Sequence, residues 1–90
     1  MVEKIFNAIE NEFGIPKKDI LSKTKTKHIS EARGILYYML HYDAKLSSAK
    51  VGEICNRQAR SIKKSISTFK FLIENQERYI TLHEKLLRQL

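Results

Sequence analysis

This chain of 90 residues has few of the residues that mark several other classes of protein. It contains one cysteine, Cys55, so no internal disulfide can form, and it contains no run of about 18 apolar residues that would cross a membrane. Its first residues lack the pattern of a secretory signal. We therefore expect a cytoplasmic protein with no membrane partner and with Cys55 as a buried thiol that packs as a small hydrophobe.

The scarcity of turn residues favours helices. Pro occurs once and Gly three times, whereas Leu, Ile, Ala, Lys and Glu recur at helical spacings and no alternating strand pattern competes. Apolar residues make up 42% of the chain and charged residues 30%, which is ordinary for a globular protein. We predict an all-α fold, a small bundle of five to six helices in which residues 1–90 form a single domain with a modest core.

The positive charge is concentrated in the middle of the chain. The net charge of +7 divides into −2 over residues 1–15, +9 over residues 16–73 and zero over residues 74–90. A segregated basic field attracts a polyanion and speeds encounter with it, so nucleic acid is the first candidate partner. On charge alone, the alternative is a solvated basic surface without a specific partner.

The first half of the chain predicts three helices. Apolar residues at helical spacing indicate a helix over residues 2–13 that ends at Gly14. Pro16 takes the first position of a second, short helix, and Ser30 is the expected N-cap of a third helix that ends near Asp43.

Between the second and third helices, residues 22–28 read SKTKTKH and include no apolar residue. We predict an exposed basic loop there. The alternation of Lys and Thr is also compatible with an edge strand, but no partner strand is predicted elsewhere.

Residues 47–73 have the pattern of two helices separated by a polar break at residues 56–58. The first is short, capped by Ser47 and Ser48, and contains the small residues Ala49, Gly52 and Cys55. The second has one apolar stripe, formed by Ile62, Ile66, Phe69 and Ile73. Its other positions carry Arg60, Ser61, Lys63, Lys64, Ser67 and Lys70, without an acid between Glu53 and Glu74. A helix pair that is buried on one side and basic on the other is typical of a DNA-binding helix-turn-helix.

After a polar interruption at residues 74–77, the apolar pattern resumes with Tyr79, Leu82, Leu86, Leu87 and Leu90. Two arrangements fit this pattern. Either a terminal helix packs back on the bundle, or the preceding helix continues.

The order of these segments resembles a known family. The stretch FGIPKKDILSKTKTKHISEAR, residues 13–33, is similar to the start of the C-terminal DNA-binding domain of the bacterial replication initiator DnaA, and residues 51–53 resemble its Ile-Gly-Asp. The resemblance implies a helix-turn-helix bundle of the DnaA C-terminal or Trp-repressor type. It also implies binding of double-stranded DNA in replication initiation or transcriptional regulation, with self-association or a larger replication assembly as possible further partners.

The chain departs from this family at the signature Gly-Gly-Arg-Asp-His-Thr-Thr-Val. Residues 56–62, Asn-Arg-Gln-Ala-Arg-Ser-Ile, fit that motif best if one glycine is missing. The groups that read bases differ, so the family's target sequence should not carry over. In the family, an arginine of the basic loop enters the minor groove, and Lys25 occupies its place here. Lysine is a more strongly hydrated point donor than arginine.

These patterns nominate specific DNA contacts. Arg60 is the best candidate for a bidentate contact to guanine, Gln58 suits adenine, and Ser61 and Lys64 reach bases or phosphates from the same helix. Phosphate or minor-groove contacts are expected from the remaining basic and hydroxyl side chains, namely Lys23, Lys25, Lys27, Arg33, Ser47, Ser48, Lys50, Arg57 and Lys63.

Other functions find little support. His28, His41 and His83 are far apart and lack partners at metal-ligand spacing, so we expect no metal, and no catalytic arrangement or phosphate-binding glycine loop is present. We expect no enzyme activity, cofactor or small-molecule substrate. The competing class is a basic protein-interaction module that docks through Phe71, Leu72 or the Leu-rich tail. An amphipathic surface for acidic membranes fits less well, because the charge is split between a loop and a helix.

Overall fold

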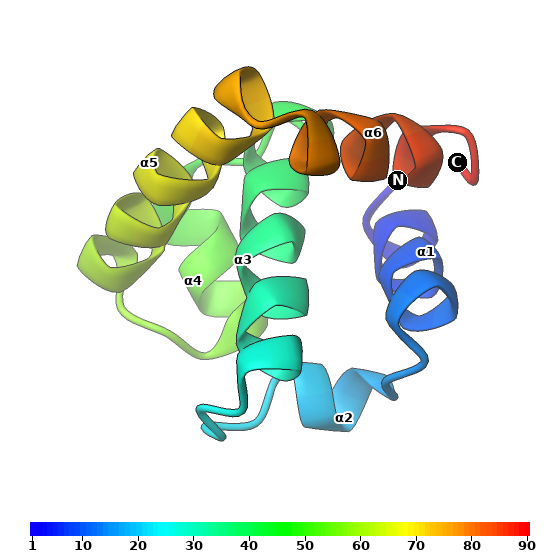
Figure 1. The fold of residues 1–90 in the computed structure, drawn as a ribbon. Helices are drawn as coiled ribbons and strands as arrows, with labels where there is room; N and C mark the ends of the chain where they lie inside the picture. The colour runs from blue at the N-terminus through cyan, green and yellow to red at the C-terminus, as the bar shows by residue number, and fades with distance from the viewer.

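The computed structural model describes residues 1–90 and consists of six α-helices without a strand (Figure 1). The helices are α1 (Val2–Phe13), α2 (Lys17–Ile20), α3 (Lys27–Tyr42), α4 (Ser48–Cys55), α5 (Ala59–Asn75) and α6 (Glu77–Leu87). The all-α prediction and the helix count are confirmed, and the Lys/Thr segment forms no strand. None of the helices is long and apolar enough to cross a membrane.

Helix α3 is the centre of the bundle. In Figure 1, α1 and α6 lie on one side of it, and α4 and α5 lie on the other. Its apolar stripe is buried between these neighbours and consists of Ala32, Ile35, Leu36, Met39 and Leu40. Burying an aliphatic side chain of this size contributes about 1.5–3 kcal/mol, so α3 supplies a large part of the core that holds the other helices in place.

The first two helices follow the sequence signals closely. Gly14 adopts a left-handed conformation, with φ of 65°, and its N–H donates to the Glu10 carbonyl 2.8 Å away. This ends α1 where predicted. Pro16 lies one position earlier relative to its helix than expected, because its ψ of 152° is extended and makes it the N-cap of α2.

Helix α3 begins about one turn before the predicted position. Its N-cap is Thr26 instead of Ser30, and the Ser30 N–H donates to the Thr26 carbonyl over 2.8 Å within the first turn. Two side chains of this extra turn have partners that favour it, since Ile29 packs against the core and His28 Nε2 lies 2.9 Å from the Phe13 carbonyl oxygen. The basic loop therefore ends at residue 26, and Lys27 belongs to the helix.

The C-terminal segment packs back on the bundle as a separate helix. The chain turns at Gln76, whose φ and ψ of −113° and 120° are extended, and Leu86 on α6 is fully buried. The Glu31 carboxylate on α3 accepts hydrogen bonds from Arg78 at 2.9 Å and from the Tyr79 hydroxyl at 2.9 Å. The structure thus decides between the two arrangements that the sequence allowed.

Helices α3 and α5 approach closely at Gly34. A Cβ atom at this position would overlap the ring of Phe69, which is part of the apolar stripe of α5. Because the residue lies inside a helix, where glycine costs stability, the close contact accounts for its presence.

We predict that Gly34→Ala lowers the free energy of unfolding by about 1–3 kcal/mol, because the added methyl group forces the Phe69 ring or α5 to move. Urea denaturation measures the change. The matched control is Ser30→Ala, at a partly exposed position of the same helix, which should alter the free energy by less than about 0.5 kcal/mol. Equal effects of the two substitutions would contradict the packing argument.

Candidate nucleic-acid interface

The turn between α4 and α5 is fixed by backbone hydrogen bonds and by a close contact. Helix α4 begins at Ser47, whose Oγ accepts from the Lys50 N–H at 3.1 Å, and ends at Asn56, whose φ of 55° is left-handed. The N–H of Arg57 donates to the Gly52 carbonyl over 2.8 Å. A Cβ on Gly52 would lie 2.5 Å from the Arg57 carbonyl oxygen, so only glycine fits there.

Asn56 is the left-handed residue that ends α4. Asparagine tolerates the left-handed conformation better than other non-glycine residues. The chain therefore makes a tight turn with no glycine at residues 56–58, and α5 starts immediately after Gln58, its N-cap.

Helix α5 has the two faces that its sequence predicts. Ile62, Ile66 and Ile73 are buried, with Ile62 fully enclosed between α3 and α4. The side chains of the opposite side at its N-terminal half are exposed; we call Arg60, Ser61, Lys63 and Lys64 the outer face of α5. Gln58 is exposed beside them at the N-cap.

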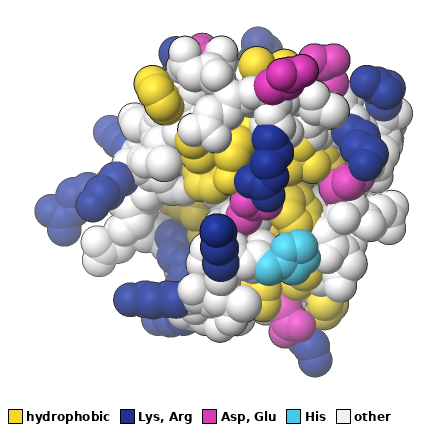
Figure 2. All heavy atoms as spheres, viewed as in Figure 1, with side chains coloured by type: hydrophobic (Ala, Val, Ile, Leu, Met, Phe, Trp, Pro, Cys, Tyr) yellow, Lys and Arg dark blue, Asp and Glu magenta, His cyan; other side chains and the backbone are white.

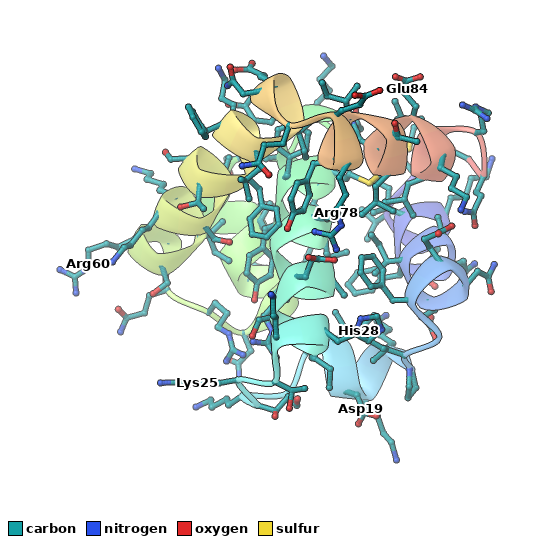
Figure 3. The ribbon with its side chains drawn as sticks, viewed as in Figure 1. Asp19, Lys25, His28, Arg60, Arg78 and Glu84 are labelled. Carbon is teal, nitrogen blue, oxygen red and sulfur yellow. The ribbon has the colours of Figure 1, made fainter.

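The loop between α2 and α3, residues 21–26, carries two further exposed cations, Lys23 and Lys25. Figure 3 shows Lys25 and Arg60 extending from the body on the same side of the molecule. Lys and Arg side chains gather along this edge in the space-filling view (Figure 2). We call the exposed cations of this loop together with the outer face of α5 the basic surface.

Hydrogen bonds between residues close in sequence determine the conformation of the loop. Ser22 Oγ donates to the Asp19 carbonyl at 2.6 Å, and the Thr24 N–H donates to Ser22 Oγ at 3.4 Å. The hydroxyls of Thr24 and Thr26 lie 3.2 Å apart. The threonines and the serine therefore order the loop, and the lysines between them project outward.

Two arginines nominated for phosphate contacts have intramolecular partners instead. Arg33 Nε donates to the Ile20 carbonyl at 2.8 Å, and Arg57 Nη2 donates to the Ser22 carbonyl at 2.7 Å. Both side chains are partly buried, and neither forms an ion pair with a carboxylate. No sequence pattern indicates these bonds, because the carbonyl acceptors lie 13 and 35 residues away along the chain.

Burial and neighbouring charges shift the pKa values of three side chains, Arg33, Tyr37 and Cys55. Burial lowers the pKa of the Arg33 guanidinium, and the charge of Arg57 lowers it further, against the effect of Tyr37. Burial likewise raises the pKa of the Tyr37 hydroxyl, which keeps it neutral. On α4, burial raises the pKa of the Cys55 thiol to about 11, as expected of a cysteine that packs as a hydrophobe.

The remaining nominated residues lie at the starts of α3 and α4. Lys27 is exposed in the first turn of α3, and Ser47, Ser48 and Lys50 occupy the start of α4. Lys50 is exposed and lies 3.5 Å from the Glu53 carboxylate, a surface ion pair that is weak in water.

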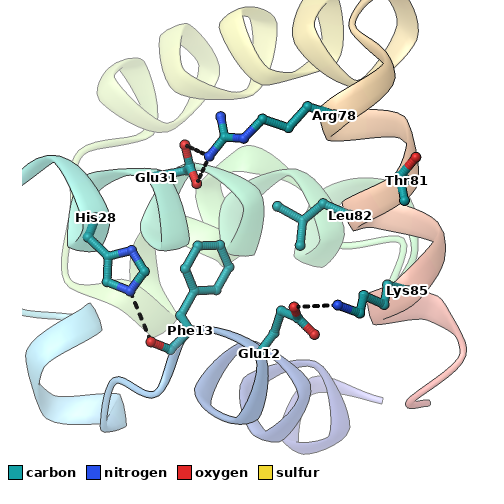
Figure 4. Close-up of a pocket in the computed structure, with 8 residues that line it drawn as sticks. All are labelled: Glu12, Phe13, His28, Glu31, Arg78, Thr81, Leu82 and Lys85. Carbon is teal, nitrogen blue, oxygen red and sulfur yellow. Dashed lines mark hydrogen bonds and ion pairs between the residues drawn. The ribbon is translucent and has the colours of Figure 1, made fainter.

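A hollow of about 300 Å³ lies between α1, α3 and α6, away from the basic residues of α5 (Figure 4). The Arg78 to Glu31 ion pair, at 2.9 Å, and the Lys85 to Glu12 ion pair, at 3.2 Å, line it together with His28. The charged groups that line it are paired with one another, and His28 Nε2 lies 2.9 Å from the Phe13 carbonyl oxygen.

The other histidines are also engaged within the fold. His41 Nδ1 lies 2.7 Å from the Leu46 carbonyl oxygen, and His83 Nε2 lies 2.9 Å from the Asp43 carboxylate. No group of three His, Cys, Asp or Glu side chains is placed to hold a metal ion.

The helix pair, its tight turn and the basic outer face of its second helix define a helix-turn-helix domain of the DNA-binding class. The chain belongs to the bacterial DnaA protein helix-turn-helix family, whose family model matches residues 2–68. It is similar to the chromosomal replication initiator protein DnaA 2 of Protochlamydia amoebophila (strain UWE25), with 24% identity over 79 residues.

That similarity covers 88% of this chain and 18% of the relative, so the chain corresponds to a small part of the relative's length. No solved structure matches. The family match over residues 2–68 confirms the resemblance that the sequence of residues 13–33 indicated.

We predict that Asn56→Ala lowers the free energy of unfolding by about 1–2 kcal/mol, because alanine is strained in the left-handed conformation. Asn56→Gly should keep the stability of the parent within about 1 kcal/mol, since glycine adopts this conformation freely. Urea denaturation of the three proteins checks both values. If alanine and glycine have the same effect at this position, the turn does not depend on the left-handed residue.

Proposed function

We propose that this protein binds double-stranded DNA, with the start of α5 in the major groove and the α2–α3 loop at the adjacent minor groove. The observation that carries the proposal is the basic surface, where exposed side chains of α5 and of the loop project to the same side of the molecule. No carboxylate of α5 lies among them, because the first acid of this helix is Glu74. The DnaA family match supports a role in replication initiation, with transcriptional regulation as the other setting.

The base contacts in this proposal come from the first two turns of α5. Arg60 is exposed and its guanidinium presents two parallel donors, which match O6 and N7 of guanine. The Gln58 amide suits adenine, and Ser61 and Lys64 reach a base edge or a phosphate from neighbouring positions. Because these groups differ from those of the family signature, we propose a target sequence different from that of the family.

The phosphate contacts in the proposal come from exposed side chains around this reading surface. Lys23, Lys25 and Lys27 serve the loop side, with Lys25 the nearest analogue of a minor-groove residue. On the other side the contacts are made by Lys63 and by the start of α4, through Ser47, Ser48 and Lys50. The backbone N–H groups of a helix start favour phosphate binding there.

One observation favours a second candidate, a protein-docking module. The Phe71 side chain on α5 is 61% exposed, and Ile80 and Leu87 on α6 are each more than a third exposed. A protein adaptor of this kind would associate with DNA only weakly and without regard to sequence.

We predict that the affinity for duplex DNA falls by roughly a thousandfold between 50 and 200 mM salt, if about six phosphates are contacted. Fluorescence anisotropy with a labelled duplex at several salt concentrations gives the slope. Salt-independent binding, or binding that is equally weak for all sequences, would favour the docking module.

We predict that Arg60→Ala reduces discrimination among sequences, with a loss of about 1–3 kcal/mol on the preferred duplex and a smaller loss on others. Lys27→Ala should weaken binding to all duplexes alike, because a phosphate contact is blind to sequence. Gel-shift titrations with a duplex selected from a random pool and with a scrambled duplex compare the two variants. A uniform loss for both variants would remove the base-reading role of Arg60.

A further inference from the structure

We propose that Arg57 is a positioning residue that holds the α2–α3 loop in place relative to the start of α5, so that both engage one duplex together. This inference rests on the proposed DNA binding and concerns how its two contact elements are coupled. In this arrangement the Arg57 guanidinium bonds to the protein and touches no DNA phosphate.

The first support is that Arg57 is fixed at both ends. Its backbone N–H donates to the Gly52 carbonyl at 2.8 Å, within the turn of the helix-turn-helix. Its Nη2 atom donates to the Ser22 carbonyl at 2.7 Å, across 35 residues of sequence. The side chain therefore spans from the start of α5 to the start of the loop.

The second support is that this bond has no substitute. Among the hydrogen bonds and ion pairs of the structure, it is the one that connects residues 21–26 with residues 47–75. The other hydrogen bonds of the loop run to α2, as from Ser22 Oγ to the Asp19 carbonyl, within the loop, or from the Thr26 carbonyl to the Ser30 N–H of α3. In the same way, the Arg33 side chain on α3 holds the end of α2 through its hydrogen bond to the Ile20 carbonyl.

The third support is electrostatic. Arg33 and Arg57 are close enough for the charge of one to lower the pKa of the other, and neither has a carboxylate partner. Two partly buried cations without an anion are a poor means of stabilising a fold. Their guanidiniums do, however, fix the direction of two consecutive backbone segments, which is what a loop that enters a groove requires.

The test is a double-mutant cycle between Arg57→Met and Lys25→Ala, with binding measured on a duplex selected from a random pool. If Arg57 positions the loop, its loss also removes the contribution of Lys25, and the double variant should bind within about twofold of Arg57→Met alone. The slope of affinity against salt for Arg57→Met should fall by no more than it does for a variant that lacks both loop lysines, Lys23→Ala with Lys25→Ala.

The matched control is Lys63→Met in the same cycle. As an exposed cation proposed to touch a phosphate, Lys63 should combine multiplicatively with Lys25→Ala, and its loss should reduce the salt slope by about 0.9. Lys4→Met, an exposed position on α1, should leave binding unchanged.

Modified bases distinguish contacts in the minor groove from contacts in the major groove. Replacing adenine by 2,6-diaminopurine adds an amino group in the minor groove only, and replacing guanine by 7-deazaguanine removes an acceptor in the major groove only. We expect wild-type protein to respond to both. The Arg57→Met variant should lose its response to diaminopurine and keep its response to 7-deazaguanine, a pattern that general destabilisation would not produce.

Circular dichroism melting establishes that each variant is folded. If Arg57→Met does not fold, Arg57→Lys takes its place, since it keeps the charge and loses the planar pair of donors. In wild-type protein, the NMR signals of the Arg57 guanidinium should also stay unchanged when DNA is added, whereas those of Arg60 should shift.

Three results would overturn the inference: multiplicative loss in the Arg57→Met cycle, an undiminished response of this variant to diaminopurine, or a DNA-induced shift at Arg57 comparable to that at Arg60. Each would leave the proposed function intact, and the DNA-induced shift would in addition assign the Arg57 guanidinium to a DNA contact. An absence of salt-dependent DNA binding by wild-type protein would instead remove the proposed function, and this inference with it.

Discussion

The packing of α5 against α3 is the constraint on which the rest of this structure depends. Ile62 and Ile66 anchor α5 to the core, and Gly34 lets the Phe69 ring lie directly against α3. Because one side of α5 is fixed in this way, its polar side has a single orientation, and the cations of its first turns project to solvent together. A helix of the same composition that packed loosely would present those charges as an average over many orientations.

The parts of this fold that could be predicted from sequence are those that depend on local periodicity. The stripe from Ile62 to Ile73, the left-handed Gly14 and the Ser47 cap each carry their signal within a few residues, and the structure confirms them. The start of α3 was misplaced, because the turn that precedes Ser30 is stabilised by contacts of His28 and Ile29 with distant residues. Such contacts leave no periodic trace in the sequence.

The candidate site also has a part that the sequence predicts and a part that depends on the tertiary fold. Five exposed cations could be nominated from their sequence positions, since no hydrogen bond or ion pair within the fold engages their side chains: Lys23, Lys25, Arg60, Lys63 and Lys64. Arg33 and Arg57 look the same in sequence, yet their guanidiniums bond to backbone carbonyls that only the tertiary fold brings near. Charge alone does not distinguish an arginine that faces a ligand from one that supports a loop.

The lack of acids along α5 limits which base edges the proposed recognition helix could accept hydrogen bonds from. Cytosine shows a hydrogen-bond donor in the major groove, and the carboxylates that accept from it elsewhere are absent between Glu53 and Glu74. Among the residues proposed to contact bases, the neutral oxygens of Gln58 and Ser61 remain for that purpose. In the proposed complex, the acceptors of guanine, adenine and thymine would therefore be the groups that this helix recognises directly, and cytosine would be recognised largely through the guanine opposite it.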